Sequence, residues 1–408
     1  MVRIVDAIMG TGKSSASITY MNEHPEKKFI YITPYLDEAK RIAAGCPIMQ
    51  FYEPQKLSQH NGSKTLHTID LVMRGENVAT THQAFRMYPM ELLDMIREKE
   101  YTLIIDENVD LLEDAEEDPG DIQMFIDAGY VAEYEGNKGV YKLVKDTYYG
   151  KAHAELMRSL RTRDLIKISN TQKESFFYWQ LPPELITAAK DVFILTYLFK
   201  GQSMHHFLEM YKIPYQFAYI ARDRSGTFRF SDTEMYVPDY VKTLGDKIHI
   251  LEHDKLNAIG DNPTALSVSW FKKPTSDIST LKNNVYNFFR HIHPAPVDQR
   301  MWSTFKSAKQ QLRGKGYTNG FIPFNQRAVN TYKSRNVAAY CVNIYMDVGQ
   351  KLFYLDNGVD VNDDDYALSA MVQWIWRSAI RDGEEIWLYI PSSRMRTLLK
   401  NWIEEVSR

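Results

Sequence analysis

The chain has 408 residues, which is long for one ordinary domain and suits two. Hydrophobic residues make up 44% and charged residues 25%, so each domain can bury a core. Cys46 and Cys341 are too far apart in the sequence to suggest a disulfide framework or a zinc site, which fits a reducing cytoplasm. No apolar stretch reaches membrane length and no signal-peptide pattern follows the N-terminus, so we expect neither a membrane span nor secretion.

The net charge of -3 hides a strong segregation of charge. Residues 102–137 contain twelve acidic residues and no Lys or Arg, whereas residues 299–346 contain eight Lys or Arg and no acidic residue. The basic stretch could contact phosphates, although both stretches could also be ordinary solvated faces.

In the first half of the chain, short apolar runs alternate with helical patterns. Residues 3–7 predict a buried strand, followed by a Gly-rich turn at 8–13 and a helix at 14–22. Further strands are expected at 29–33, 77–81, 101–105 and 192–197, and further helices at 36–44 and 90–99. This alternation predicts a parallel sheet with crossover helices.

Residues 112–185 interrupt that rhythm. They open with an acidic turn and include a basic, mostly helical segment at 151–173, so we interpret them as an insertion in the first domain. After residue 201 the pattern is weaker. Strands are expected at 265–271, 320–324 and 386–390, and helices at 281–289, 305–313 and 366–381. The sequence therefore predicts two α/β domains, at residues 1–203 and 204–408.

The strongest motif is Ala-Ile-Met-Gly-Thr-Gly-Lys-Ser at residues 7–14. It follows an apolar strand and precedes a helix, which is the arrangement that presents backbone N–H groups to a triphosphate. Lys13 would reach the β- and γ-phosphates, and Ser14 would ligate Mg²⁺. Ala7 stands where the strict P-loop pattern has Gly. The residues expected to contact the nucleotide are Met9, Gly10, Thr11, Gly12, Lys13, Ser14 and Ser15.

A second motif is the apolar run at 101–105 that ends in Asp106-Glu107-Asn108. Asp106 is expected to belong to the Mg²⁺ shell, and Glu107 to polarise the attacking water. Adjacent acids at a strand end are also common on surfaces, and it is the preceding P-loop that favours the catalytic interpretation.

A third motif is Gln373-Trp-Ile-Trp-Arg377-Ser-Ala-Ile-Arg381. Its polar residues are four apart, so they are expected on one helical face. An arginine from this face could stabilise the negative charge that builds up on the γ-phosphate. Alternatively, these arginines pair with local acids such as Asp382 or Glu384 on a surface helix.

In this order the three motifs resemble those of superfamily 2 helicases, over nearly the whole chain. Residues 7–14 match the helicase motif I, including its alanine, 106–108 resemble motif II, and 373–381 resemble motif VI. The resemblance implies two tandem RecA-like domains that hydrolyse ATP with Mg²⁺ in the cleft between them. Catalysis would then use Lys13 and Glu107 from one domain and Gln373, Arg377 and Arg381 from the other.

Weaker matches fall between these motifs. Residues 33–36 and 80–83 are similar to nucleic-acid contact motifs, residues 195–197 stand in the place of the coupling motif III, and residues 328–335 are our assignment for motif V. The resemblance thus implies nucleic-acid contacts at Pro34, Thr81 and His82. It also implies adenine selectivity, although no glutamine motif precedes the P-loop. Motif VI has its arginines four apart here instead of three, and motif II lacks its usual third and fourth residues.

The basic stretch adds a second set of nucleic-acid candidates. Its cations are interleaved with aromatic residues, which suits a single strand, although most of these rings could instead belong to a core. The cations that we select are Lys306, Lys309, Arg313 and Arg327.

Together these features favour an ATP-dependent helicase or translocase on single-stranded or forked nucleic acid, with DNA preferred. The compact form resembles helicases of phages and viral origin-binding proteins, which implies DNA replication or recombination, replication proteins as partners, and the host cytoplasm. One alternative is a terminase-like packaging ATPase with a metal-dependent nuclease that uses Asp356, Asp360 and residues 363–365. Another is an ATP-binding nucleic-acid module without unwinding activity. The acids at 360–365 could equally cap the helix that carries Gln373.

Overall fold

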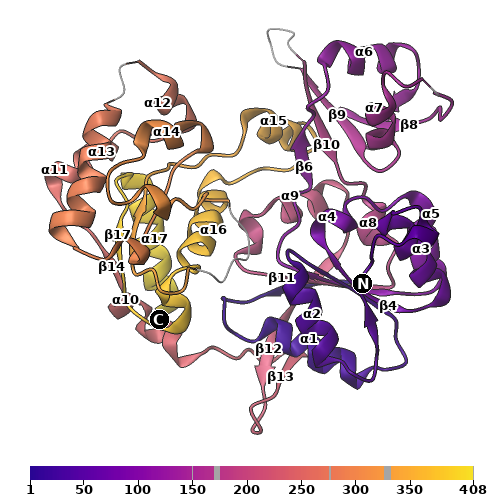
Figure 1. Ribbon diagram of the computed structural model, residues 1–408, viewed down its shortest axis with the longest axis horizontal. Coiled ribbons are helices and arrows are strands. Elements are labelled where there is room, and N and C mark those ends of the chain that lie inside the picture. Colours follow the sequence, from indigo (N-terminus) through magenta and orange to yellow (C-terminus); the bar gives the residue numbers. More distant parts are fainter. Residues whose placement is uncertain (149, 170–174, 275–276, 326–331, 408) are drawn as a thin grey trace. The chain divides into compact units, whose positions relative to one another are not determined.

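The computed structural model describes residues 1–148, 150–169, 175–274, 277–325 and 332–407, and divides into two compact units. The first unit comprises Met1–Ile8, Gly12–Tyr236 and Asp347–Val361. The second comprises Met9–Thr11, Val237–Met346 and Asn362–Arg408. Figure 1 shows the elements of both units.

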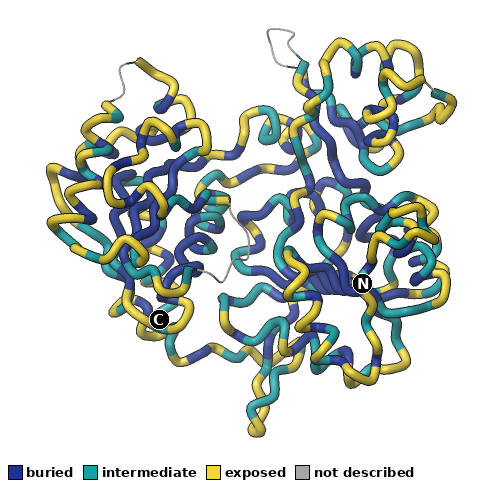
Figure 2. Tube along the Cα trace, in the orientation of Figure 1, coloured by how far each residue is buried: buried dark blue, intermediate teal, exposed yellow. Residues whose placement is uncertain are grey.

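The first unit is built on an eight-stranded sheet with the order β13-β12-β1-β11-β5-β2-β4-β3. All of its neighbouring strands are parallel except the β12–β13 pair. Its strands are β1 (Val2–Asp6), β2 (Phe29–Thr33), β3 (Phe51–Tyr52), β4 (Asn77–Thr81), β5 (Thr102–Asp106), β11 (Asp191–Thr196), β12 (Tyr215–Arg222) and β13 (Phe228–Ser231). Every residue of β2 and β5 is buried, as expected for parallel strands with both faces covered. The buried centre of the sheet is visible in Figure 2.

Helices connect these strands and cover the sheet. They are α1 (Lys13–Glu23), α2 (Leu36–Gly45), α3 (Lys64–Arg74), α4 (His82–Phe85), α5 (Met90–Glu98), α8 (Glu184–Thr187) and α9 (Ser203–Met210). Two apolar clusters fill the space between sheet and helices, one around Ile30, Leu103 and Ile194 and the other around Phe29 and Ile104. Neighbouring strand residues thus point to opposite faces, and each face packs against its own helices.

The insertion forms a separate antiparallel sheet with the order β6-β10-β9-β8-β7. Its elements are β6 (Leu112–Asp114), α6 (Pro119–Asp127), β7 (Val131–Glu133), β8 (Val140–Leu143), α7 (Ala154–Leu160), β9 (Asp164–Ser169) and β10 (Ser175–Gln180). Helix α15 (Val348–Asp356) also belongs to this unit, although it is encoded late in the chain. Tyr178 donates a hydrogen bond of 2.9 Å to Asp347, and Lys138 forms an ion pair of 2.9 Å with Asp356.

The second unit has a four-stranded parallel sheet with the order β14-β17-β16-β15. Its strands are β14 (Ile248–Ile250), β15 (Arg300–Ser303), β16 (Val337–Tyr340) and β17 (Ile386–Tyr389). Its helices are α10 (Leu244–Lys247), α11 (Asp254–Asn257), α12 (Val268–Lys272), α13 (Ile278–Asn287), α14 (Lys309–Leu312), α16 (Asp363–Ile375) and α17 (Ser393–Ser407). The expected fold class, tandem RecA-like α/β domains on parallel sheets, is confirmed.

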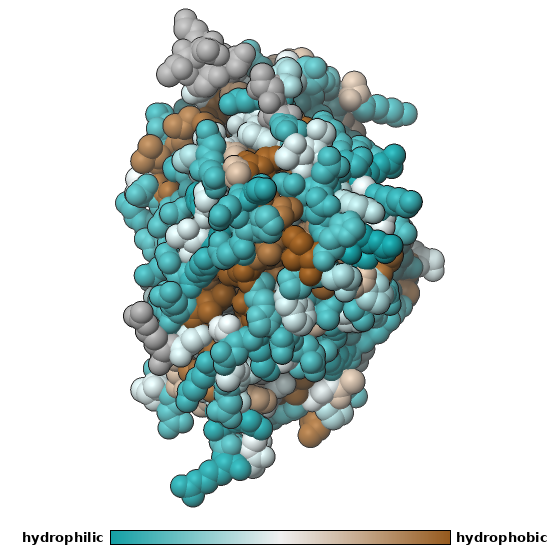
Figure 3. Space-filling view, turned by 90° about the vertical axis from the view of Figure 1, so that its left-hand side faces the viewer, coloured by the Kyte–Doolittle hydropathy of each residue, from teal (hydrophilic) through white to brown (hydrophobic). Residues whose placement is uncertain are grey.

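One face of the molecule carries a band of apolar side chains among predominantly hydrophilic ones (Figure 3). The large apolar residues that are exposed in the second unit are Val237, Val268, Tyr286, Val297 and Tyr345. Within the part of the chain that the structure describes, no helix has the length and apolarity to cross a membrane.

Two of the expected strands in the second half are wrong. Residues 265–271 alternate like a strand, but the Ser267 hydroxyl accepts a hydrogen bond from the Trp270 N–H and starts α12. Residues 320–324 contribute one isolated bridge, between Phe321 and Trp302, because Pro323 cannot donate to a sheet ladder. The helix expected at 305–313 is reduced to a 3₁₀ turn, Lys306–Ala308, followed by α14.

The first unit also extends beyond residue 203, where the sequence placed a domain boundary. Strand β12 pairs with β1 in parallel, so residues 215–222 complete the first sheet instead of opening the second domain. This pairing joins residues more than 200 positions apart, so local sequence patterns do not predict it.

Candidate functional site

The loop between β1 and α1 has the backbone that a phosphate-binding turn requires. Gly10 and Gly12 have φ angles of 88° and 86°, which residues with a β-carbon rarely adopt. Gly12 is also the N-cap of α1, so the N–H groups of the first helical turn point into the loop. The Lys13 ammonium donates to the carbonyl oxygens of Ala7 and Ile8, which hold it over the loop.

Asp106, at the end of β5, is the centre of the site. Its Oδ2 accepts a hydrogen bond of 3.2 Å from the Ser14 hydroxyl and one of 2.8 Å from the Tyr31 hydroxyl. The backbone carbonyl of Asp106 lies 2.8 Å from His82 Nε2. Strand β2 and the first turn of α1 therefore meet at the carboxylate that ends β5, and the start of α4 contacts the backbone carbonyl of the same residue.

Burial governs the acid–base chemistry of this carboxylate. Asp106 is 8% exposed, and burial raises its pKa, while the hydrogen bond from Tyr31 and the charge of Lys13 lower it. Burial likewise raises the pKa of Asp6, whose two carboxylate oxygens accept hydrogen bonds from the N–H groups of Leu198 (2.8 Å) and Phe199 (3.1 Å). Through Asp6, the end of the P-loop strand positions the turn that follows β11.

Glu107 follows Asp106 with an unusual backbone. Its φ is 65°, in the left-handed region that a residue with a long side chain rarely adopts, and its N–H donates to the Leu195 carbonyl at 3.0 Å. The half-buried carboxylate therefore leaves the strand in a direction that a regular strand would not allow. Strained backbone of this kind is concentrated at functional sites.

These residues fit a Mg²⁺-bound nucleoside triphosphate. Ser14 Oγ and the Asp106 carboxylate are adjacent oxygen donors, which Mg²⁺ prefers. The glycine turn and the N-terminus of α1 offer N–H groups to phosphate oxygens, and Lys13 supplies a positive charge. Of the other residues predicted to contact nucleotide, Thr11 is buried, Met9 is half-buried and Ser15 is exposed on α1.

Comparison with known proteins places the chain in a family. A protein family model described as the YonV C-terminal Rossmann-like domain matches residues 242–403. The SPbeta prophage-derived uncharacterized protein YonV of Bacillus subtilis (strain 168) is 34% identical over 412 residues, which cover 99% of this chain and 98% of the relative. The chain belongs to the YonV family.

Solved structures similar to this YonV-family chain include helicases, at low sequence identity. An XPD helicase has a TM-score of 0.46 at 10% identity and covers 100% of this chain and 94% of its own. An apo form of XPD has a TM-score of 0.42 at 12% identity, with coverages of 98% and 95%. The DUF1998 helicase MrfA bound to DNA and AMPPNP has a TM-score of 0.36 at 10% identity, with coverages of 99% and 48%.

In the second unit, the residues predicted for motif VI do not share one helical face. Helix α16 ends at Ile375, so Arg377 follows the helix and Arg381 lies in the 3₁₀ turn Ala379–Asp382. Arg377 is 6% exposed, whereas Arg381 is exposed. The helix ends here because the residues after Trp376 turn back, with the N–H of Ala379 donating to the Arg335 carbonyl.

The N-terminus of α16 explains the acidic run at 360–365. The Asn362 side chain accepts hydrogen bonds from the N–H groups of Asp364 (2.9 Å) and Asp365 (3.4 Å), and three aspartates occupy the first turn. Asp364 also pairs with Arg394 at 2.7 Å. Asn362 therefore caps the helix that carries Gln373 and the three aspartates follow it in the first turn, whereas Asp356 and Asp360 of the nuclease alternative belong to the other unit.

Two nucleic-acid candidates of the first unit have internal contacts. The Thr81 hydroxyl accepts from the Ala84 N–H and caps α4, and His82 is 8% exposed behind Asp106. Pro34 is half-buried where β2 ends. These contacts tie the loop after β4 to motif II, a role that the sequence did not indicate, and contact of these residues with nucleic acid stays a prediction.

The basic stretch of the second unit is divided between surface and interior. Lys306 and Arg313 are exposed, and the Lys309 ammonium lies 4.5 Å from the centre of the Phe321 ring. Arg300, in contrast, is 7% exposed and donates to the carbonyls of Ala295 and Gly316. Arg327, with part of the segment assigned to motif V, lies outside the described residues.

Two residues of the site, Tyr31 and Asp6, were not predicted from the sequence. Tyr31 is the middle residue of an apolar strand and looked like core, and only the pairing of β2 with β5 brings its hydroxyl to Asp106. Asp6 offered a signal, since a carboxylate at the end of an otherwise apolar strand before a P-loop is unusual.

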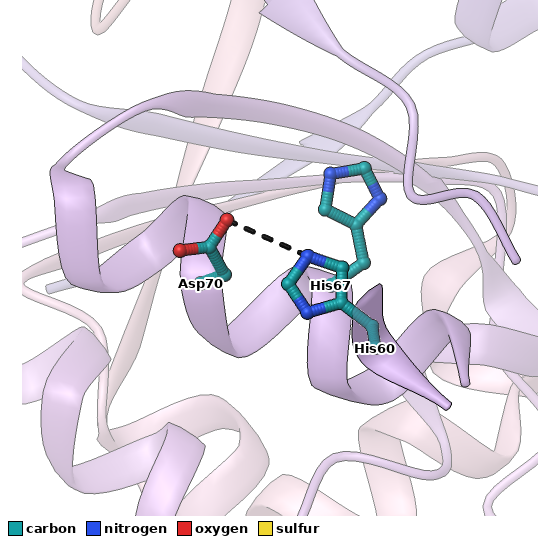
Figure 4. A group of neighbouring side chains, drawn as sticks. All are labelled: His60, His67 and Asp70. Carbon is teal, nitrogen blue, oxygen red and sulfur yellow. Dashed lines mark ion pairs between the residues drawn. The ribbon is translucent and has the colours of Figure 1, made fainter. Parts of the chain in front are cut away.

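A cluster of possible metal ligands lies apart from this site (Figure 4). Ligand atoms of His60, His67 and Asp70 are within 4.8 Å of one another. However, the two imidazole rings stack 5.0 Å apart at 13°, so their in-plane lone pairs run nearly parallel instead of converging. His67 Nδ1 accepts from the Gln55 N–H at 2.9 Å, and Asp70 pairs with Arg74 at 3.0 Å. These contacts indicate that the cluster fastens residues 55–60 to α3.

Proposed function

We propose that this YonV-family chain is an ATP-driven motor on nucleic acid, a helicase or translocase of superfamily 2. The observation that carries the proposal is the meeting of Ser14 and Asp106 beside Lys13, at the mouth of a glycine turn with two positive φ angles. Hydrolysis of a nucleoside triphosphate needs these groups in this arrangement.

Each residue of the first unit has a distinct task in this proposal. Lys13 and the N–H groups at the start of α1 bind the phosphates and neutralise their charge. Ser14 and Asp106 would hold Mg²⁺, which would supply positive charge beside the phosphates. Glu107, released from the strand by its left-handed backbone, orients the attacking water and accepts its proton.

The second unit supplies the coupling in this proposal. Arg381, which is exposed, is assigned as the residue that stabilises the γ-phosphate in the transition state, with Gln373 and Arg377 supporting the closed arrangement. Lys306, Lys309, Arg313 and Arg327 would follow a single strand. DNA is the favoured substrate, with replication or recombination as the process, and the prophage origin of the relative favours a phage-encoded protein in a host cytoplasm.

ATP hydrolysis with and without single-stranded DNA tests the proposal. We expect DNA-stimulated hydrolysis in the natural protein. Lys13→Ala should abolish it, because the variant loses the ammonium that binds the phosphates from the P-loop. Glu107→Gln should retain ATP binding and lose turnover by about 10²-fold or more. Wild-type turnover in Glu107→Gln would exclude our assignment of motif II.

The same experiment separates a motor from a passive module. A protein that binds ATP and DNA without hydrolysis would match the binding-module alternative, and DNA cleavage that needs Mg²⁺ but no ATP would match the packaging-nuclease alternative. Movement along the strand is then measured by displacement of an annealed oligonucleotide.

A further inference from the structure

The position of the P-loop strand in the sheet indicates which way a bound nucleotide points from its phosphates to its base. Strand β1 has β11 and then β5, which carries Asp106, on one side, and β12 with β13 on the other. If the γ-phosphate and Mg²⁺ lie towards Asp106, as the proposed function requires, the nucleoside end of the same molecule points towards the β12–β13 hairpin. This inference therefore rests on the proposed function and adds the recognition of the base.

The hairpin touches the P-loop through an aromatic ring. A β-carbon placed on Gly12 would lie 2.6 Å from Cγ of Phe228 and 2.7 Å from its Cδ1, so the ring packs directly on the glycine α-carbon. Phe228 is half-buried and is the first residue of β13. Gly12 is thus required both for its positive φ and for the approach of this ring.

Two further side chains extend the ring into a stacking surface. The Arg222 guanidinium lies 5.4 Å from the centre of the Phe228 ring and 5.5 Å from that of the Tyr236 ring. The two ring centres are 5.7 Å apart, and Arg222 donates to the Tyr236 hydroxyl at 3.2 Å. The two rings are inclined by 62° and the guanidinium lies beside both, so a flat, electron-rich base can stack on one ring or on the guanidinium plane.

The hairpin is held firmly beside α1. Arg229 pairs with Glu23 in the last turn of α1 at 2.9 Å, and Phe230 stacks on Phe193 of β11 with ring centres 4.7 Å apart. Arg222 and Phe228 face each other directly across the hairpin. The surface is therefore fixed relative to the P-loop before any ligand arrives, which reduces the entropy lost on binding.

We propose that Phe228, Tyr236 and Arg222 form the platform on which the base of the bound nucleoside triphosphate stacks. Stacking rewards ring area rather than a hydrogen-bond pattern, so purine nucleotides should bind more tightly than pyrimidine nucleotides.

The test compares ATP with inorganic tripolyphosphate, both with Mg²⁺, by calorimetric titration of the full chain. Tripolyphosphate occupies the P-loop but has no base. We expect Arg222→Ala and Tyr236→Ala to weaken ATP binding by roughly 5- to 100-fold, the range that one stacking contact provides, and to leave tripolyphosphate binding unchanged. Arg224→Ala, which removes an exposed arginine from the turn of the same hairpin, is the matched control and should bind both ligands normally.

Phe228 needs a gentler change because it supports the loop. Phe228→Leu keeps apolar bulk against Gly12 and should weaken ATP alone, whereas Phe228→Tyr keeps the ring and should restore the affinity. Wild-type ATP affinity in both Arg222→Ala and Tyr236→Ala would overturn the platform. Equal loss of ATP and tripolyphosphate in those two variants would overturn it as well, since the hairpin would then only support the loop.

The failure of the proposed function has a different signature. Lys13→Ala should weaken ATP and tripolyphosphate together, because it removes charge from the phosphate end. If the natural protein binds neither ligand, the nucleotide site itself is refuted. If the natural protein and the hairpin variants all bind both ligands normally, the nucleotide site is supported and the base platform is refuted.

Discussion

At the scale of single residues, the site depends on carboxylates that burial makes difficult to ionise. The Asp106 carboxylate accepts hydrogen bonds from the Ser14 and Tyr31 hydroxyls. Both carboxylate oxygens of Asp6 accept hydrogen bonds from backbone N–H groups. The sequence identified Asp106 because its neighbours in the chain form a motif. It could not identify Tyr31, because that contact exists only after two strands pair.

A third buried carboxylate, Asp164 in the insertion, gives the molecule a dependence on pH. Burial raises its pKa to about 7, against the charge of Lys142, whose ammonium is 3.6 Å away. The folded state therefore holds a proton here that the unfolded state has already lost above about pH 4. Between pH 4 and 7 the folded state binds more protons at this group than the unfolded state does. The free energy of unfolding therefore falls as the pH rises through this range, and above about pH 8 this group causes no further change.

We expect Asp164→Asn to remove this decrease in unfolding free energy with rising pH. Relative to the natural protein, the variant should gain stability as the pH rises from 5 to 8, by an amount on the order of 2 to 4 kcal/mol at most. Urea denaturation at four pH values measures it. Asp146→Asn, at an exposed carboxylate whose pKa is lowered by its hydrogen bond to Arg161, should show no such trend over this range. Parallel pH profiles for Asp164→Asn and the natural protein would contradict the prediction.

At the scale of elements, local signals predicted the elements that local chemistry controls. The strands of the first half are long apolar runs stopped by turn residues, and they form where expected, including β11 between β1 and β5. In the second half, the strand prediction was wrong where a single side chain determines the structure. The Ser267 hydroxyl caps a helix in a stretch whose alternating pattern predicts a strand. Helix α16 stops before Arg377 although its pattern continues, because the following residues turn back and bond to Arg335.

The cap of α16 offers a test at this scale. Asn362→Ala removes the acceptor for two N–H groups and should cost about 1 kcal/mol of unfolding free energy. Asn362→Ser retains an acceptor and should recover most of the loss. Guanidinium denaturation of the three proteins measures both effects, and an Ala variant as stable as the Ser variant would show that the cap contributes nothing.

At the scale of the whole molecule, the sequence predicted two α/β units but not where the chain passes between them. Residues 204–236 finish the first sheet, and residues 347–361 return to the first unit. Ser14 of the P-loop contacts Asp106 across the first sheet, while the catalytic roles of these residues stay a prediction. The role of the second-unit arginines remains a proposal, for which turnover is the direct readout.

Arg381 should be needed for catalysis and not for binding. With saturating single-stranded DNA, we expect Arg381→Ala to lower ATP turnover by about 10³-fold while ATP affinity changes little, since the side chain acts on charge that develops in the transition state. Lys400→Ala, at another surface cation of the second unit, is the control. Normal hydrolysis in both Arg381→Ala and Arg377→Ala would leave the first unit as a self-contained ATPase.

The late position of α15 has a consequence for how the protein is made. Its contacts through Asp347 and Asp356 complete the insertion sheet region of the first unit, yet the ribosome adds these residues only after more than 100 residues of the second unit have emerged. The first unit is therefore incomplete during most of synthesis, because the partners of Tyr178 and Lys138 are synthesised late. A nascent chain that stalls before residue 347 leaves this surface uncovered, a point at which chaperones and proteases would distinguish finished from unfinished molecules.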